Sequence, residues 1–158
     1  MLKFRVKKII LILSLSFLCI NSSFAWNNLK GIEDFKLNIE HQGDCEGIKF
    51  DQEVNTSIKY LIANSKINLV EKNKPGEYLT ATILTVGSDL VCASYVKLSS
   101  YSFGYANNSA GKEDFYLLES FSGSSILKAS PSRHKQQVIN WFEAETKSFV
   151  VEWMEAQK

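Results

Sequence analysis

The spacing of the apolar residues changes at Asp51, and this change does most to limit the folds open to the chain. Before it, residues 35–41 alternate apolar and polar side chains, which is typical of a strand with one buried face. After it, apolar residues from Val54 to Ile62 recur at helical spacing and predict a helix over 52–63, with Asp51 as its N-cap. A strand that leads into such a helix requires a sheet with a helical layer on one face.

The rest of the pattern predicts more strands and a second long helix. Four further segments, separated by short polar turns, are rich in β-branched or aromatic residues: 66–71, 78–86, 90–105 and 115–123, the last extended by 124–129. Short turns favour an antiparallel meander. The pair Ser130-Pro131 predicts the start of an amphipathic helix that ends near residue 157. The expected fold class is therefore α+β, a two-layer domain in which about five antiparallel strands carry a helix after the first strand and a long C-terminal helix.

Residues 1–25 resemble a secretory signal peptide. Four basic residues precede an apolar run over 9–20, and the small residues Ser23 and Ala25 precede the expected cleavage point. The run is about 12 residues long, short of the roughly 20 that span a bilayer. We therefore expect a signal peptide at 1–25, a single domain at 26–158 and no stable membrane anchor after cleavage. A retained anchor and lipidation at Cys19 are the weaker alternatives, since a bulky Leu precedes that cysteine.

Removal of the signal changes the charge of the domain. The whole chain has a net charge of +1, and the signal carries four positive residues and no negative ones, so residues 26–158 carry −3. A mildly acidic domain without a basic run offers nothing that would hold nucleic acid. It also lacks the cationic face of a protein that binds anionic lipid.

Two cysteines, Cys45 and Cys92, remain after the signal is removed, in a chain expected to reach an oxidising compartment. Such a pair is most often one disulfide. Closing a loop of about 48 residues would stabilise the fold by about 4 kcal/mol in the chain-entropy treatment.

The stretch HQGDCEG at 41–47 leaves other interpretations open. His41 could activate Cys45 as a nucleophile only if the backbone turned to bring the two side chains together. A zinc site would need three or four ligands, and calcium could bind weakly to the acids of this loop. The disulfide is the favoured interpretation, so we predict no metal site.

Tyr101, Phe103 and Tyr105 alternate along the strand predicted over 90–105 and would share one face of it. Two arrangements are open. The three rings could pack under the C-terminal helix, or they could form a partly exposed patch at the tip of a hairpin that holds a protein partner. His134, between two basic residues near the start of the long helix, is expected in a solvated first turn or, alternatively, in a small anion site.

The chain contains no nucleophile elbow, no zinc-protease motif, no phosphate-binding loop and no C-x-x-C motif. These absences favour a protein that is not an enzyme and has no cofactor. The leading hypothesis is a small binding or accessory module, periplasmic or secreted, that acts through an unidentified protein partner. One alternative is a small secreted hydrolase whose site combines scattered acids with His41. Another is a secreted effector or enzyme inhibitor.

Overall fold

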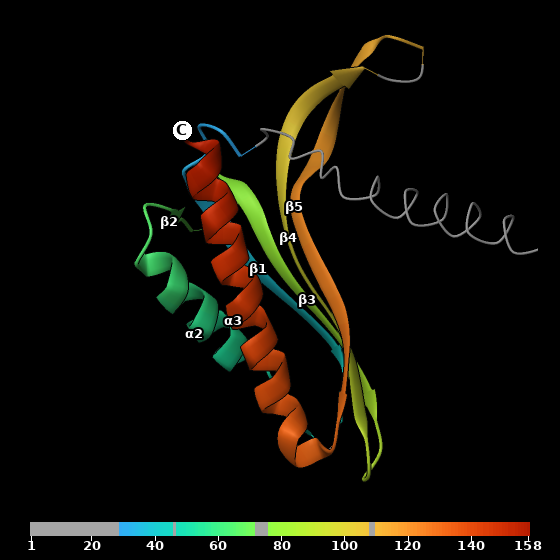
Figure 1. The fold of residues 1–158 in the computed structure, drawn as a ribbon. Coiled ribbons are helices and arrows are strands. Elements are labelled where there is room, and N and C mark those ends of the chain that lie inside the picture. Colours follow the sequence, from blue (N-terminus) through green and yellow to red (C-terminus); the bar gives the residue numbers. More distant parts are fainter. Residues whose placement is uncertain (1–28, 46, 72–75, 108–109) are drawn as a thin grey trace, which may run out of the picture.

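The computed structural model describes residues 29–158 except 46, 72–75 and 108–109 (Figure 1). The expected signal peptide at 1–25 lies outside the described residues. Within them the chain forms one sheet and two helices, whose bounds in chain order are β1 (Asp34–Gly43), α2 (Asp51–Ala63), β2 (Asn68–Leu69), β3 (Glu77–Gly87), β4 (Cys92–Asn107), β5 (Glu113–Ala129) and α3 (Pro131–Ala156). The predicted α+β class, the helix after the first strand and the long C-terminal helix are confirmed.

The sheet is mixed rather than wholly antiparallel. Its strand order is β2-β1-β3-β4-β5, and β1 runs parallel to both of its neighbours. Only the pairs β3–β4 and β4–β5 are antiparallel, so the expected meander is confined to the last three strands. The physical reason is α2, which carries the chain back to the end of the sheet where β1 started. Both β2 and β3 begin at that end, so each of them pairs with β1 in the same direction.

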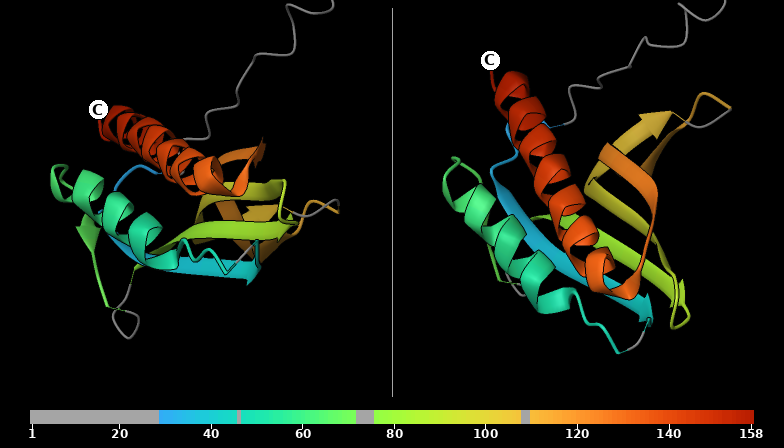
Figure 2. Two further views of the ribbon diagram at one scale, coloured as in Figure 1. Left: turned by 90° about the horizontal axis from the view of Figure 1, so that it is seen from below. Right: turned by 60° about the horizontal axis from the view of Figure 1, so that its bottom comes forward.

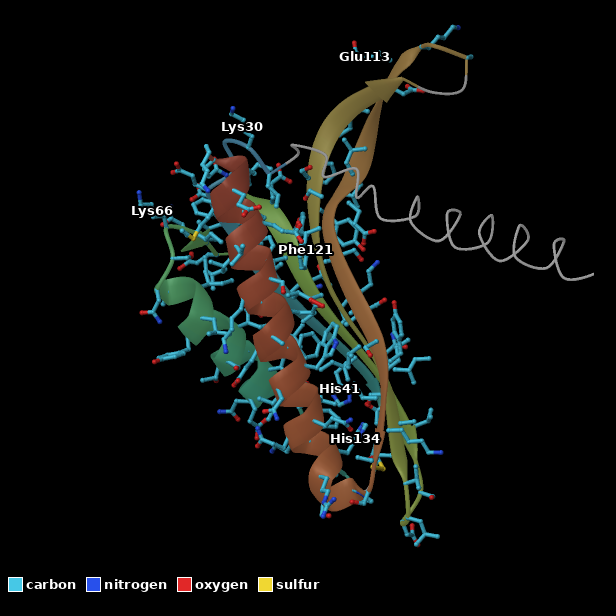
Figure 3. All side chains as sticks on the ribbon, viewed as in Figure 1. Lys30, His41, Lys66, Glu113, Phe121 and His134 are labelled. Carbon is cyan, nitrogen blue, oxygen red and sulfur yellow. A yellow bond between two sulfur atoms is a disulfide. The ribbon has the colours of Figure 1, made fainter. Side chains whose placement is uncertain are left out.

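Both helices cover the same face of the sheet, and the other face, here called the outer face, carries no helix (Figure 2). Alternate residues of β3 and β4 point to the helices and form the core with the apolar stripes of α2 and α3. Phe149 of α3 anchors this core, because its ring meets Phe35 of β1 and Phe121 of β5 edge-on, each at 5.3 Å between centroids. Figure 3 shows Phe121 on the side of the sheet that faces α3.

The hairpin of β4 and β5 extends beyond the rest of the sheet. The pairing of β3 with β4 ends at Tyr78 and Tyr101, whereas β4 and β5 remain paired as far as Asn107 and Glu113. The register shifts between Ser100 and Tyr101, where β5 contains one surplus residue. Such a bulge bends a strand, and the hairpin bends away from α3 beyond this point (Figure 1).

No helix in the described part of the chain is both long enough and apolar enough to span a membrane.

Candidate functional site

Cys45 and Cys92 form a disulfide, as predicted, with 5.8 Å between their Cα atoms. Both residues are buried, and the bond fastens the loop between β1 and α2 to the first residue of β4. Because both sulfur atoms are in this bond, neither thiol is available as a nucleophile or a metal ligand. A buried structural disulfide is compatible with a protein that folds outside the cytoplasm.

His41 lies on the helix-facing side of β1, and its Nδ1 is 2.6 Å from Oδ1 of Asp51. The prediction that Asp51 is the N-cap of α2 is wrong. The N-cap is Phe50, which makes no side-chain cap, and Asp51 is the first helical residue, with its carboxylate bonded to the imidazole. The ring of Phe50 meets the imidazole of His41 edge-on, at 5.3 Å between centroids. The pair therefore ties the end of β1 to the start of α2.

A shallow depression of about 560 Å³ borders this pair and is lined by Gly47, Ile48, Lys49, Asp51, Gln52, Glu53 and Lys135. Lys135 forms an ion pair with Glu53, and the hydrogen bond from this lysine holds the pKa of Glu53 below its usual range. A general base here would need His41 Nε2 to reach water in the depression. That nitrogen is buried and has no hydrogen-bond partner among the described residues, so the arrangement is poorly built for acid–base chemistry.

A second polar cluster lies under the start of α3. The hydroxyl oxygen of Ser94 is 2.7 Å from Nε2 of His134 and 2.8 Å from Oγ1 of Thr85. The expectation of a solvated or anion-binding His134 is wrong, because the side chain is fully buried and its desolvation lowers its pKa. The distance between Ser94 and His134 is that of a serine–histidine pair. With Ser94 only 1% exposed, no substrate can reach the hydroxyl.

These two clusters lie near the same end of the sheet, where Figure 3 labels His41 and His134. Phe50 separates the two imidazoles, with its ring 5.9 Å from that of His134. Among the described residues, no group of three or more His, Cys, Asp or Glu side chains is arranged to hold a metal ion. Both imidazoles are held by contacts within the fold, His41 by Asp51 and Phe50 and His134 by Ser94 and Phe50.

At the opposite end of the molecule, four of the described side chains are apolar, exposed and on the outer face: Tyr78, Phe103, Phe115 and Leu117, here called the outer aromatic cluster. The rings of Phe103 and Phe115 are stacked, with centroids 5.6 Å apart and 2° between their planes. Each is more than half exposed, at 52% and 58%, and Leu117, directly opposite Phe103, is 55% exposed. Tyr78 meets Phe103 edge-on at 6.4 Å.

The outer aromatic cluster lies on the face away from α3. Ser100 pairs with the core residue Phe121, so the next residue of β4, Tyr101, and then Phe103 point to the other side of the sheet. The arrangement in which this ribbon packs under the C-terminal helix is therefore wrong for Tyr101 and Phe103. The side chain of Tyr105 lies outside the described residues, and its backbone pairs with Phe115.

Tyr101 is half-buried and borders the cluster toward the centre of the sheet. Lys97 donates a hydrogen bond to its hydroxyl at 3.4 Å and forms an ion pair with Glu119 at 2.6 Å. The bond to Glu119 raises the pKa of Lys97. For Glu119, burial alone would raise the pKa, but the bond and the charge of Lys97 hold it below the usual value. This polar group holds the ring of Tyr101, whereas Phe103, Phe115 and Leu117 are each more than half exposed.

Glu77 and Lys36 form the other border of the cluster. Glu77 accepts a hydrogen bond at 3.2 Å from the backbone N–H of Phe103, which lies just past the end of the β3–β4 ladder. Burial raises the pKa of this carboxyl. The ammonium of Lys36 lies 4.9 Å from the centroid of the Tyr78 ring, within the range of a cation–π contact. The exposed rings therefore have a charged border, as binding surfaces commonly do.

The sequence pattern identified Phe103 but missed Tyr78 and Leu117 as members of the cluster. Each lies on a different strand from Phe103, and the contact depends on the register of β4 with β3 and β5. The pairing of Phe103 with Leu117 depends on the surplus residue in β5, because one extra residue reverses the face on which each later residue of the strand lies. The alternation of apolar and polar residues in the sequence does not show where that surplus residue stands.

Comparison with known proteins adds likenesses of shape alone. No family model matches the chain, and no curated protein matches it significantly. Two of the solved structures that resemble it are a protein described only as uncharacterized, with a TM-score of 0.40 and 8% identity, and the hypothetical protein CT253 from Chlamydia trachomatis, with a TM-score of 0.37 and 12% identity. The first alignment covers 76% of this chain and 91% of that one, and the second covers 75% and 98%.

Proposed function

We propose that this protein is an exported, non-enzymatic binding module that holds a protein partner with the outer aromatic cluster. The observation that carries the proposal is the stacked pair of Phe103 and Phe115, which is more than half exposed at the end of a projecting hairpin. Core packing does not account for two large apolar rings in this position, since α2 and α3 lie on the other face of the sheet.

The composition of the cluster fits a protein partner. Exposed aromatic side chains bordered by polar and charged groups are the usual make-up of an interface centre and its rim. Covering apolar surface of this kind contributes about 25 cal/mol per Å² before the costs of association. A secreted effector or inhibitor would use the same surface and would differ only in its target.

The protein is proposed to work in the bacterial periplasm or outside the cell. This part of the proposal rests on the signal-like residues 1–25 and on the disulfide, which would be maintained in an oxidising compartment.

The test replaces the exposed side chains and keeps the fold. The double variant Phe103→Ser, Leu117→Ser removes the centre of the cluster. Its matched control is Leu84→Ser, Ile126→Ser, which removes two exposed apolar side chains from the outer face at the other end of the sheet. A photo-reactive residue in place of Leu117 captures the partner in the producing cell, and the captured protein is then purified and titrated against each variant.

We expect the cluster variant to weaken binding by at least about tenfold, as for other central apolar contacts, and the control to bind within about twofold of the original protein. Equal binding by both variants would remove the cluster from the interface. Circular dichroism and denaturant unfolding verify that both variants are folded.

A further inference from the structure

Beyond Tyr101, the side of β4 that faced β3 has no neighbouring strand. The pairing of β3 with β4 ends at Tyr78 and Tyr101, whereas β4 continues to Asn107 as part of the projecting hairpin (Figure 1). Among the described residues, no backbone hydrogen bond joins this side of β4 to another segment past that point. An edge of this kind can take up an extended chain as an added strand.

At the first position of this edge, a side chain lies where the missing strand would be. The backbone N–H of Phe103 points to the β3 side and donates to Oε2 of Glu77 at 3.2 Å, in a contact exposed to solvent. In a continued antiparallel ladder, that N–H would donate to the backbone carbonyl of the residue opposite Phe103. Gly76 does not supply this carbonyl, because it lies on the β1 side, where a Cβ on it would stand 3.1 Å from the backbone oxygen of Asp34. A carboxylate therefore occupies the acceptor position of an added strand.

The surroundings of this carboxylate both favour and oppose its charge. Burial raises the pKa of Glu77, and the N–H of Phe103 and the charge of Lys36 offset this effect only in part. The ammonium of Lys36 is held beside the site, 4.9 Å from the centroid of the Tyr78 ring. The position thus offers a hydrogen-bond donor and a nearby cation to a negative group. A carboxylate that also brought backbone and apolar contacts would compete well with that of Glu77.

The start of β3 limits the kind of chain that can add here. A strand antiparallel to β4 and in line with β3 would run toward Glu77, where β3 begins, and would have to end there. Its last residue would lie opposite Phe103, accept the N–H of Phe103 with its main-chain carboxylate and donate its own N–H to the Phe103 carbonyl. A parallel strand would instead place a positively charged amino terminus close to Lys36, and like charges repel.

The outer aromatic cluster provides the contact for the side chain of that last residue. Directly opposite residues of two neighbouring strands point to the same face, so this side chain would lie on the outer face beside the ring of Phe103. The third-last residue would lie on the same face, opposite the backbone of Tyr105. Phe103 is 52% exposed, and apolar side chains at these two positions would cover it.

We infer that this edge of β4 binds the free C-terminus of the protein partner as an added strand, with an apolar last residue against Phe103 and with its carboxylate in the place of that of Glu77. This inference rests on the proposed function, because it uses the same cluster of exposed rings. It adds the chemistry of the bound segment, which is a chain end rather than an internal stretch of the partner.

The experiment titrates the purified protein with a synthetic peptide of about six residues, the length of a typical strand. The peptide is acetylated at its N-terminus and has leucine at the last position, valine at the third-last, threonine at the others and a free carboxylate. One modified version has a C-terminal amide, and two others carry an N-methyl group on the last or on the second-last backbone nitrogen.

In the added strand, the N–H of the last residue faces β4 and that of the second-last residue faces away. We therefore expect the amide and the peptide methylated at the last nitrogen to bind at least about tenfold more weakly than the free acid. The peptide methylated at the second-last nitrogen should bind within about twofold of it. In NMR spectra, the amide signal of Phe103 should shift when the free acid binds.

Two protein variants with matched controls test the site itself. Glu77→Ala removes the competing carboxylate and should bind the free acid about threefold to tenfold more tightly, whereas Glu40→Ala, an exposed acid of β1, should leave the affinity unchanged. Lys36→Gln should weaken binding by about fivefold. Its control is Lys128→Gln, at the other end of β5, which should bind like the original protein. Circular dichroism verifies that each variant is folded.

Four results would overturn the inference. The amide could bind as well as the acid, the two methylated peptides could bind equally, or Glu77→Ala could bind no more tightly than Glu40→Ala. The fourth result is a protein that sediments as a dimer without peptide and has a protected Phe103 amide, which would assign the edge to a second copy of this chain.

A change to the captured partner separates this inference from the proposed function. Two glycines added after the last residue of the partner should abolish its binding, because the chain would then meet the start of β3. If the extended partner bound as before and Phe103→Ser, Leu117→Ser still weakened binding, the inference would be wrong and the proposed function would stand.

Discussion

The imidazole Nε2 of His134 lies 2.7 Å from the hydroxyl oxygen of Ser94, and the sheet and α3 close both side chains off from solvent. The two atoms are as close as those of a catalytic serine–histidine pair, but both side chains are buried and out of reach of a substrate. Its measurable consequence is in stability rather than in turnover.

Acid should weaken the fold through His134. Burial lowers its pKa in the folded protein below the ordinary value of about 6.5. Its contribution to stability is therefore fully present above pH 6.5, and it is lost as the pH falls from there through the folded pKa, because the unfolded chain binds the proton first. The slope from this one residue is at most about 1.4 kcal/mol per pH unit.

Urea unfolding at a series of pH values between 7.5 and 5 measures that slope. The variant His134→Gln keeps a side chain that can bond to Ser94 but does not titrate, so the difference between the two proteins isolates the histidine. Identical slopes would show that His134 does not take up a proton on unfolding.

Loss of the disulfide should cost about 2–4 kcal/mol. The bond closes a loop with a sequence separation of 47, and the entropy of that loop returns to the unfolded chain when the bond is removed. The variant Cys45→Ala, Cys92→Ala should therefore unfold at lower denaturant concentration. In the original protein, thiol labelling followed by mass spectrometry should find no free Cys45 or Cys92 even after denaturation. Free thiols at these two positions would contradict the assignment.

Two glycines with nearly the same backbone angle should respond differently to alanine. Gly43 has a φ of +78°, and a Cβ there would stand 1.9 Å from the backbone oxygen of Thr85. Gly31 has a φ of +76° and nothing within 4 Å of that position. We expect Gly31→Ala to cost about 1 kcal/mol from the left-handed conformation alone. Gly43→Ala should cost several times as much, because the backbone of β3 must move. Denaturant unfolding of the two variants, compared side by side, provides the measurement.

Alanine substitutions at two phenylalanines of the β4–β5 hairpin should also differ strongly in their effect on the free energy of unfolding. Phe121 is 7% exposed and meets Phe149 edge-on, so Phe121→Ala should lower the free energy of unfolding by about 3–5 kcal/mol. Phe103→Ala removes a ring that is mostly in water and should cost less than about 1 kcal/mol. Calorimetry of both variants gives the comparison. A large loss for Phe103 would mean that the outer aromatic cluster serves the fold.

The elements could be predicted from the sequence to within a few residues because each has its own periodicity. The alternation over 35–41, the stripe over 52–63 and Ser130-Pro131 are all local signals, and the structure has an element at each. The disulfide could be predicted because only two cysteines remain beyond residue 25. These inferences required no knowledge of which strands are neighbours in the sheet.

The features that the sequence did not predict depend on pairing. Parallel pairing of β1 with β3 follows from the path of α2, which no periodicity records. His134 looked solvated because its neighbours Arg133 and Lys135 are charged, but α3 turns the side chain of His134 toward Ser94. The exposure of Phe103 could be raised as a possibility and not decided, since the face it occupies is set by the register with β5.

The surplus residue at the bulge is Ser120, which stands between the partners of Ser100 and Tyr101. On its two sides, odd-numbered residues of one continuous strand serve opposite surfaces: Phe121 points inward and Leu117 outward. Deleting that single serine would leave both faces assigned as they are while removing the bend of the arm. One codon thus governs the direction of the hairpin, and with it the direction in which the outer aromatic cluster faces, without altering a core side chain.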